Sequence, residues 1–201
     1  MVDKEKVRGC ILLSALKRFS HYGFNKTTMA EIAKDCSMSA ANLYRYFKDK
    51  AEIGLCITKN HFEREHKIII DIIERKGSPS KKLGQVFLAL VNYNASEFDN
   101  SPAIMELVDH VCTNGSELID AHREKMHFFI SKILKEGQQS GDFRVSNIDE
   151  TAKTIAFASI PFHATPVFLL LKCGGHTRET MQEMALRVAD LMVKGIKKKK
   201  K

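Results

Sequence analysis

The sequence is poor in the features that mark sheets, membrane spans and secreted proteins. Only four of its 201 residues are proline, and no pair of alternating segments joined by turn residues predicts a hairpin. No uninterrupted apolar run approaches the roughly 18 residues that a membrane span needs. The first residues carry alternating charge rather than the apolar stretch of a secretory signal, so we expect a soluble chain that is not exported.

Paired cysteines and the common catalytic motifs are missing as well. The five cysteines are scattered and never spaced as CxxC, a set typical of reduced thiols in a cytoplasm. The chain has no nucleophile elbow with a Ser-His-Asp order, no phosphate loop and no glycine fingerprint. Its glycine pair at 174–175 instead marks the end of a helix. We therefore expect no enzyme, no cofactor and no metal site.

Charge is present in ordinary amount but is unevenly distributed. The formal net charge is +8, and 44% of the residues are hydrophobic against 28% charged, which is typical of a folded globular chain. Residues 1–50 contain ten Lys and Arg against five Asp and Glu. A second positive cluster is the lysine run at 197–201, which we interpret as a solvated tail. The basic N-terminal region is the one that predicts contact with nucleic acid.

Helix signals follow one another along almost the whole chain. Apolar residues recur at steps of three and four, and Ser, Thr, Asn or Pro stand where each helix begins. We expect an all-α fold of about nine helices, with a head at 1–48, a body at 49–196 and the tail at 197–201. The first four expected helices cover about 4–22, 29–35, 40–46 and 50–75. The next two begin at Ser78-Pro79 and at Ser101-Pro102, and the seventh covers about 116–139. The eighth begins at 147–150 and is broken at Pro161 and Pro166, and the ninth begins at Thr177.

The helices at 29–35 and 40–46 have the size of a helix-turn-helix. They are joined by a very short turn, and the first helix supplies the apolar support that such a pair needs. Ile32, Ala33, Leu43 and Phe47 fall on the inward face. Ser39 caps the second helix, and the outward face near its start carries the residues that we expect to meet base edges in a major groove: Ala40, Ala41, Asn42 and Arg45.

A second group of side chains suits the phosphate backbone. Phenol hydroxyls, ammonium groups and the N–H groups of a helix start donate hydrogen bonds to phosphate. Tyr44 fits a core position and a phosphate contact equally well, whereas Tyr46, next to Arg45 and Lys48, fits an outward position. The expected phosphate contacts are Thr28, Tyr44, Tyr46, Lys48 and Lys50.

Residues 12–53 resemble the DNA-binding head of the tetracycline-repressor (TetR) family. The stretch LLSALKRFSHYGFNKTTMAEIAKDCSMSAANLYRYFKDKAEI carries a dozen spaced positions of that family in register. The resemblance implies a bacterial transcriptional repressor, a homodimer that binds operator DNA and whose C-terminal domain binds a small inducer. Ala40 and Ala41 depart from the usual pattern, so we expect less direct base readout and more shape readout.

The body carries weaker signals for the dimer and the inducer. By the same resemblance, the last two helices pair with their copies in a second chain; the alternative is that they close the core of one chain. A small apolar or aromatic inducer is expected to contact residues among the middle helices, where His163 stands between two prolines that break a helix. The candidate ligand residues are Phe87, Tyr93, Asn94, His110, Phe129, Phe157 and His163.

Two rival functions keep the DNA-binding head but change the rest. A metal- or redox-responsive regulator would use His110 with Cys112, or thiols such as Cys10 and Cys36, although residues two apart on a helix face different sides. An architectural DNA binder would use the basic ends without sequence preference, and the ratio of operator to random-sequence affinity separates it from a regulator.

Overall fold

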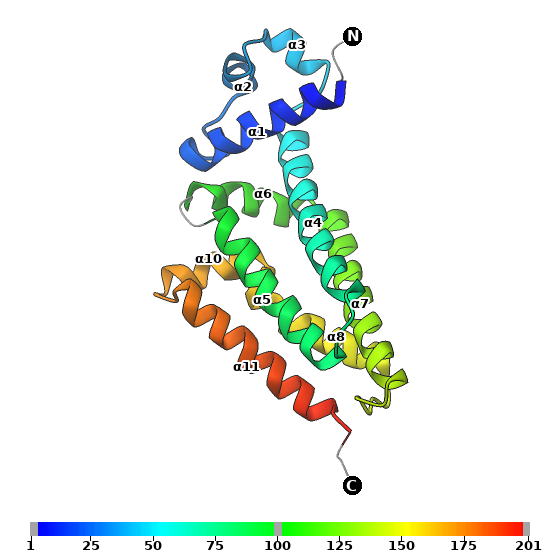
Figure 1. The fold of residues 1–201 in the computed structure, drawn as a ribbon. Helices are drawn as coiled ribbons and strands as arrows, with labels where there is room; N and C mark the ends of the chain where they lie inside the picture. Colours follow the sequence, from blue (N-terminus) through cyan, green and yellow to red (C-terminus); the bar gives the residue numbers. More distant parts are fainter. Residues whose placement is uncertain (1–3, 99–101, 199–201) are drawn as a thin grey trace. The chain divides into compact units, whose positions relative to one another are not determined.

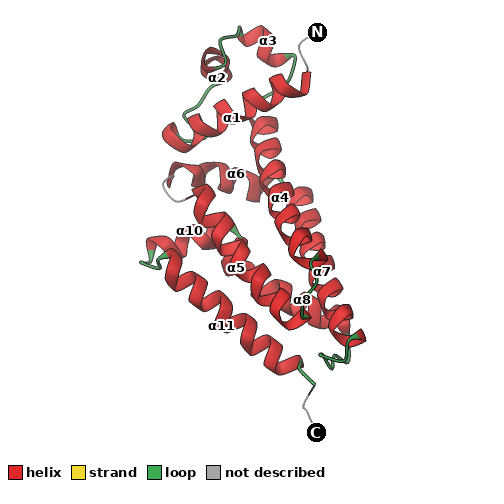
Figure 2. Cartoon of the chain, viewed as in Figure 1, coloured by secondary structure: helices red, strands yellow, loops and turns green. Residues whose placement is uncertain are grey.

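The computed structural model describes residues 4–98 and 102–198, and its helices in that part of the chain are shown in Figures 1 and 2. No strand occurs among these residues, in agreement with the all-α prediction. The helices are α1 (Lys4–Tyr22), α2 (Met29–Asp35), α3 (Ala40–Tyr44), α4 (Lys50–Glu74), α5 (Pro79–Phe98), the 3-10 helix η1 (Pro102–Ile104), α6 (Met105–Asn114), α7 (Ser116–Gln139), α8 (Ile148–Ala158), α9 (Ile160–His163), α10 (Thr165–Cys173) and α11 (Arg178–Ile196).

The described residues divide into two compact units. The first, here called the head unit, comprises the described parts of 1–62 and 100–119; the second, the body unit, comprises those of 63–99 and 120–201. Helices α4 and α7 therefore contribute residues to both units. This division follows packing, so it differs from the boundary at residue 48 that the change in charge suggests, and the functional boundary stays a prediction.

The head unit is built on the apolar stripe of α1. Ile11, Ala15 and Phe19 lie four residues apart and are fully buried, which is the spacing of one helix face. α1 ends where Gly23 takes a φ of +91°, a conformation that glycine adopts without strain. Figure 1 shows α2 and α3 on one side of α1. The prediction that this helix ends at residue 22 is confirmed.

Side-chain caps define the helix starts that the sequence predicts. Thr28 and Glu31 form the expected capping box at α2, while Ser39, Asn147 and Thr177 cap α3, α8 and α11. Two boundaries differ from expectation, and one expected start falls on a residue outside the described part of the chain. α3 ends at Tyr44 rather than at 46, Pro102 begins a 3-10 helix before α6 starts at Met105, and Ser101 lies outside the described residues.

The start of α4 also differs in one detail from the predicted capping box. Asp49 accepts a hydrogen bond from the Glu52 backbone N–H at 2.7 Å. The Glu52 carboxylate accepts from the backbone N–H of Lys48 at 2.8 Å rather than from that of Asp49. Both hydrogen bonds of a capping box are therefore present, but the donor to Glu52 is the residue before Asp49. Together they satisfy backbone N–H groups that the start of a helix leaves unpaired.

The body unit has a continuous apolar core. α5 packs along α11 (Figure 1), and α5, α7, α8 and α11 all contribute fully buried side chains. Lys82 lies in this interior, where its ammonium donates to the Ile73 carbonyl and to Glu136 at 2.8 Å. A buried ammonium is retained because each of these bonds replaces one that it would make with water.

The prolines at 161 and 166 divide the long apolar stretch into three helices. α8 ends at Ala158, α9 covers one turn, and Pro166 stands in the first turn of α10, where its missing N–H leaves no helical bond unmade. Ser159 at the first break is fully buried and donates to the Ala156 carbonyl at 2.7 Å. This division, which the sequence predicts as a kink or break, raises the number of described α-helices from about nine to eleven.

Candidate nucleic-acid interface and interior polar cluster

The turn between α2 and α3 holds the two helices at a defined angle. Ser37 takes the left-handed conformation with a φ of 54°, and the Met38 N–H returns to the Ala33 carbonyl at 3.0 Å. Bonds of this kind satisfy the last carbonyls of a helix. Ile32 and Leu43 are fully buried, so an apolar contact surface and a closed turn together produce the predicted helix-turn-helix.

Two arginines of α1 brace this pair. The Arg8 guanidinium donates to the Tyr46 carbonyl and lies 4.0 Å from the centroid of the Phe47 ring. Arg18 donates from Nε to Asp35 at 2.6 Å, and the pKa of that carboxyl lies below its usual range because of the hydrogen bond. No role was predicted for these arginines from the sequence, although their spacing of three residues from Ile11 and Ala15 places them beside the apolar stripe of α1, on the face that packs on α2 and α3.

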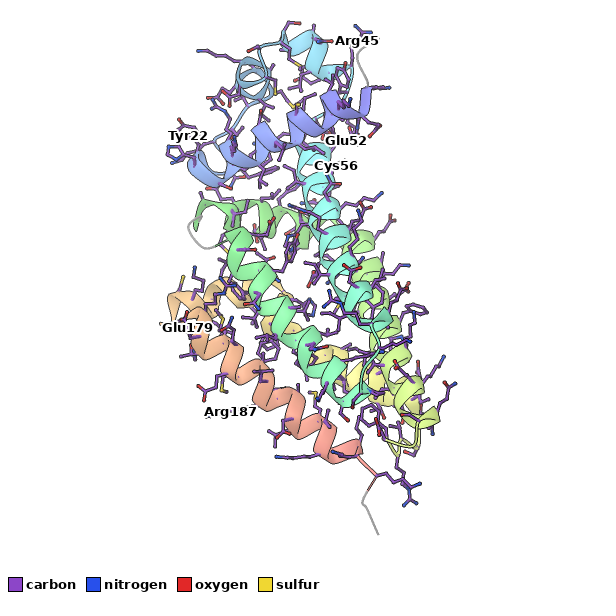
Figure 3. All side chains as sticks on the ribbon, in the orientation of Figure 1. Tyr22, Arg45, Glu52, Cys56, Glu179 and Arg187 are labelled. Carbon is purple, nitrogen blue, oxygen red and sulfur yellow. The ribbon has the colours of Figure 1, made fainter. Side chains whose placement is uncertain are left out.

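The outward side of α3 carries the residues predicted to meet DNA. Tyr44 is 54% exposed, which places it at the surface rather than in the core, and the exposed Arg45, labelled in Figure 3, follows α3 as its C-cap residue. Tyr46 is half-buried. The predicted contacts are exposed at Thr28, Ser39, Ala41, Tyr44, Arg45 and Lys48, and partly buried at Ala40, Asn42, Tyr46 and Lys50.

Lys50 is used within the head unit in a way that the sequence analysis did not anticipate. Its ammonium donates to the carbonyls of Phe24 at 2.5 Å, Thr27 at 2.8 Å and Asn25 at 3.2 Å. An ammonium has three N–H donors, so all of them are engaged in the bend between α1 and α2. Burial lowers the pKa of this group. In this structure Lys50 shapes the bend rather than offering its charge to a phosphate.

The same bend is closed by α6. The Glu106 carboxylate accepts from the Asn25 backbone N–H at 2.7 Å, and the His110 ring stacks on Phe24 with centroids 4.6 Å apart. Gly54 on α4 admits the Leu107 side chain, because a Cβ at this position would lie 2.7 Å from Leu107 Cδ1. These contacts place α6 and η1 in the head unit.

A chain of polar side chains lies inside the body unit. His66 Nε2 is 3.0 Å from His122 Nδ1, and His122 Nε2 is 3.3 Å from His163 Nδ1. His163 Nδ1 is in turn 3.9 Å from Glu65 Oε1. Burial raises the pKa of Glu65 to about 8 and lowers that of His163 to about 4, because each loses the hydration of its charged form.

Three members of this cluster, Glu65, His66 and His122, were not among the residues predicted from the sequence. Only His163 was a candidate, on account of the broken helix around it. The signal for Glu65 lies in its spacing, since it precedes the buried Ile69 by four residues and Ile72 by seven. A carboxylate on the apolar stripe of a long helix indicates a polar partner from another helix.

The predicted ligand residues fall into three groups. Phe87, Asn94, Phe129 and His163 are buried in the body unit, and Tyr93 is half-buried there. Phe157 is a correction, because its side chain is 76% exposed and cannot line an interior cavity of one chain. The assignment of His110 to the same set stays a prediction. This histidine belongs to the head unit, where Phe24 covers its ring.

Known proteins resemble this chain in sequence and in fold. The HTH-type transcriptional regulator YuxN of Bacillus subtilis is 28% identical over 163 residues, which cover 81% of this chain and 44% of YuxN. HbdR of Aromatoleum is 33% identical over 79 residues, covering 39% of this chain and 34% of HbdR. The chain thus spans less than half the length of these curated relatives.

A solved structure extends the comparison to the whole fold. A transcriptional regulator from Cytophaga hutchinsonii matches with a TM-score of 0.72 at 22% identity, covering 94% of this chain and 97% of that protein. At this identity the match concerns the fold alone. It includes both helical units, so the arrangement of elements along the chain is that of a known regulator.

The helix-turn-helix and the second helical unit define a two-part, all-helical protein of the DNA-binding regulator class. The family model described as bacterial regulatory proteins, tetR family, matches residues 11–54, and the model described as tetracyclin repressor-like, C-terminal domain, matches 79–186. The second match alone covers more than half of the sequence. The chain therefore belongs to the TetR family, as the resemblance in residues 12–53 predicts.

Proposed function

We propose that the protein is a homodimeric transcriptional repressor that binds operator DNA and is released from it by a small molecule. The observation that carries this proposal is the outward face of α3, which presents Asn42 and Arg45 on a capped helix held by α1 and α2. We propose no catalytic activity for it. Within the described residues no helix is long and apolar enough to cross a membrane, and we propose a cytoplasmic location.

Recognition of the operator divides between base and phosphate contacts. Asn42 suits the donor and acceptor pair of adenine, and the Arg45 guanidinium suits the two acceptors of guanine. Ala41 offers only a methyl group, so the number of direct base contacts is small and DNA shape contributes more. Lys48 and Tyr44 are exposed beside this face and suit phosphate, which fixes position rather than sequence.

Dimerisation is supported by apolar side chains that one chain leaves uncovered. Leu170 on α10 and Leu191 on α11 are 70% and 68% exposed, and Met184 and Leu186 on α11 are also exposed. Figure 3 shows Glu179 and Arg187 on the same helix, so the uncovered surface of α11 carries charged residues beside the apolar ones. A symmetric pairing of the apolar side buries these residues and presents two α3 helices to two half-sites.

A small inducer is supported by the interior of the body unit. Asn94 is fully buried, and its Oδ1 has no hydrogen-bond partner among the described residues. Phe87, which is fully buried, contributes to the apolar core of the same unit. Such surroundings suit a small apolar or aromatic molecule with one donor group. Its binding would favour the form of the dimer that does not bind DNA.

Selection of bound genomic fragments followed by quantitative binding tests this function. Asn42→Ala should relax preference at one base position by about 1–3 kcal/mol while leaving random-sequence affinity unchanged. Lys48→Ala should weaken operator and random DNA alike and reduce the slope of log affinity against log salt by about 1. Equal affinity of the unmodified protein for selected and random DNA would contradict a sequence-specific repressor and support the architectural alternative.

A further inference from the structure

The interior polar cluster of the body unit contains a set of donor atoms that a cation would satisfy. Among the described residues, Glu65, His122 and His163 form the one group of three or more possible metal ligands whose donor atoms all lie within 4.8 Å of one another. All three side chains are buried. We infer that these residues bind one divalent transition-metal ion of the zinc class, and that His66 orients His122 within the site.

The three ligands come from three separate helices of one unit. Glu65 lies on α4, His122 on α7 and His163 at the end of α9. Two ligands at about 2.0–2.1 Å from a tetrahedral ion stand about 3.3 Å apart. The separations of His163 Nδ1 from His122 Nε2 and from Glu65 Oε1 are 3.3 and 3.9 Å. Small side-chain rotations therefore bring the atoms to coordination distance.

Glu65 provides the observation that distinguishes this cluster from an ordinary polar contact. Its side chain is 1% exposed, and neither carboxylate oxygen has a hydrogen-bond partner among the described residues. A buried carboxylate without a partner is costly whether it is charged or protonated, since its oxygens lose their bonds to water. His163 Nε2 is likewise buried and unpartnered. A cation in the cluster would satisfy the Glu65 carboxylate, whereas His163 Nε2 lies on the opposite side of the ring from the Nδ1 that faces the cluster.

His66 occupies the position of an orienting group behind a metal ligand. Histidines that bind a metal through one ring nitrogen usually donate a hydrogen bond from the other nitrogen to an acceptor. His122 Nδ1 lies 3.0 Å from His66 Nε2, and the two rings are nearly parallel. In this arrangement His122 donates from Nδ1 to His66 and presents Nε2 to the ion.

The donor set determines the class of cation. Two imidazoles and one carboxylate suit Zn²⁺ and its first-row neighbours, whereas Mg²⁺ and Ca²⁺ select oxygen ligands. Three protein ligands leave the fourth position of a tetrahedral ion for water or another small ligand. The inference rests on the body unit alone and does not depend on the proposed binding of DNA.

Metal binding to the full chain tests this site. After removal of metals with a chelator, titration with Zn²⁺ should show one tight site for each chain, and Co²⁺ should give the intense visible absorption of a tetrahedral complex. His122→Ala and Glu65→Gln should each weaken binding of Zn²⁺ at least 100-fold. His66→Phe should weaken it about 10- to 100-fold, as loss of an orienting partner does.

A control variant and a second readout make the result decisive. His21 is exposed on α1, so His21→Ala should leave the stoichiometry and affinity for Zn²⁺ unchanged. If a site variant fails to fold, the Co²⁺ spectrum of the unmodified chain still reports whether imidazole and carboxylate ligands bind the ion. The inference is overturned if the unmodified chain binds no Zn²⁺ or Co²⁺ tightly, or if binding persists in the folded Glu65 and His122 variants.

Discussion

The role of the Lys50 ammonium in the structure differs from the one that its position in the sequence indicates. In the sequence it is a lysine at a helix start beside a predicted DNA face. In the structure it joins three backbone carbonyls of the bend that precedes α2. Carbonyls that lose this partner are left partly buried without a donor, so the residue supports the position of α2 and Thr28 rather than the charge of the surface.

Replacement of Lys50 by methionine should lower the stability of the head unit by about 1–3 kcal/mol, because hydrogen bonds to a charged group are lost while the apolar stem is kept. Operator affinity should fall with it. The slope of log affinity against log salt should stay unchanged, in contrast to the decrease of about 1 expected for Lys48→Ala. Denaturant unfolding and salt-dependent binding measure the two effects. A lower slope of log affinity against log salt for the Lys50 variant would indicate that Lys50 contacts a phosphate after all.

Residues that act through their immediate neighbours in sequence were predicted well. Thr28, Ser39, Asn147 and Thr177 cap helices as their positions indicate, since a cap depends on backbone atoms two or three residues away. The position of Phe157 was not predicted correctly, because an aromatic residue at helical spacing is compatible with a core and with an exposed face. Only packing distinguishes the two.

At the scale of elements, α7 and the segment after it show a close approach that a glycine permits. A Cβ on Gly137 would lie 2.0 Å from Cδ2 of the Phe143 ring, and Phe143 is itself buried. The segment that follows α7 therefore folds back against the last turns of that helix. The Phe143 N–H donates to the Gly137 carbonyl at 2.9 Å, which closes this return.

Gly137→Ala should destabilise the body unit by about 1–3 kcal/mol, since the ring or the helix must move to admit the methyl group. Gly84→Ala provides the matched control in the same unit. Its Cβ would meet only the Leu186 Cδ2 atom at 3.8 Å, so the gain in helix propensity should stabilise the protein by about 0.5–1 kcal/mol. Thermal and urea unfolding measure both, and a stabilising Gly137→Ala would contradict the close approach.

Helix positions were predicted more accurately than helix ends where tertiary contacts intervene. The apolar stripe of α1 and the proline signals before α5 determine those elements through local physics. α3 is two residues shorter than predicted, and the Tyr46 carbonyl just beyond its end binds the Arg8 guanidinium of α1 instead of continuing the helix. A carbonyl held by another helix need not continue a helical hydrogen-bond pattern.

At the scale of the whole molecule, the proposed dimer depends on the apolar side of α11. Leu191→Glu places a charge where the copy of this helix is expected to lie, so it should shift a stable dimer to monomer at micromolar concentration and weaken operator binding at least tenfold. Lys135→Glu on the exposed side of α7 is the control for charge and should leave the dimer intact. Sedimentation equilibrium measures both, and an unchanged dimer in the Leu191 variant would exclude this surface as the interface.

The sequence alone determined the class of fold, most helix starts, the helix-turn-helix and the family of this protein, because these depend on periodicity, caps and short spacings. Only the tertiary structure placed Glu65, His66, His122 and His163 together, assigned Lys50 to the bend before α2, and separated exposed Phe157 from the buried aromatics. These features join residues that lie tens of positions apart. Their proximity results from the packing of whole helices, which no local pattern of residues encodes.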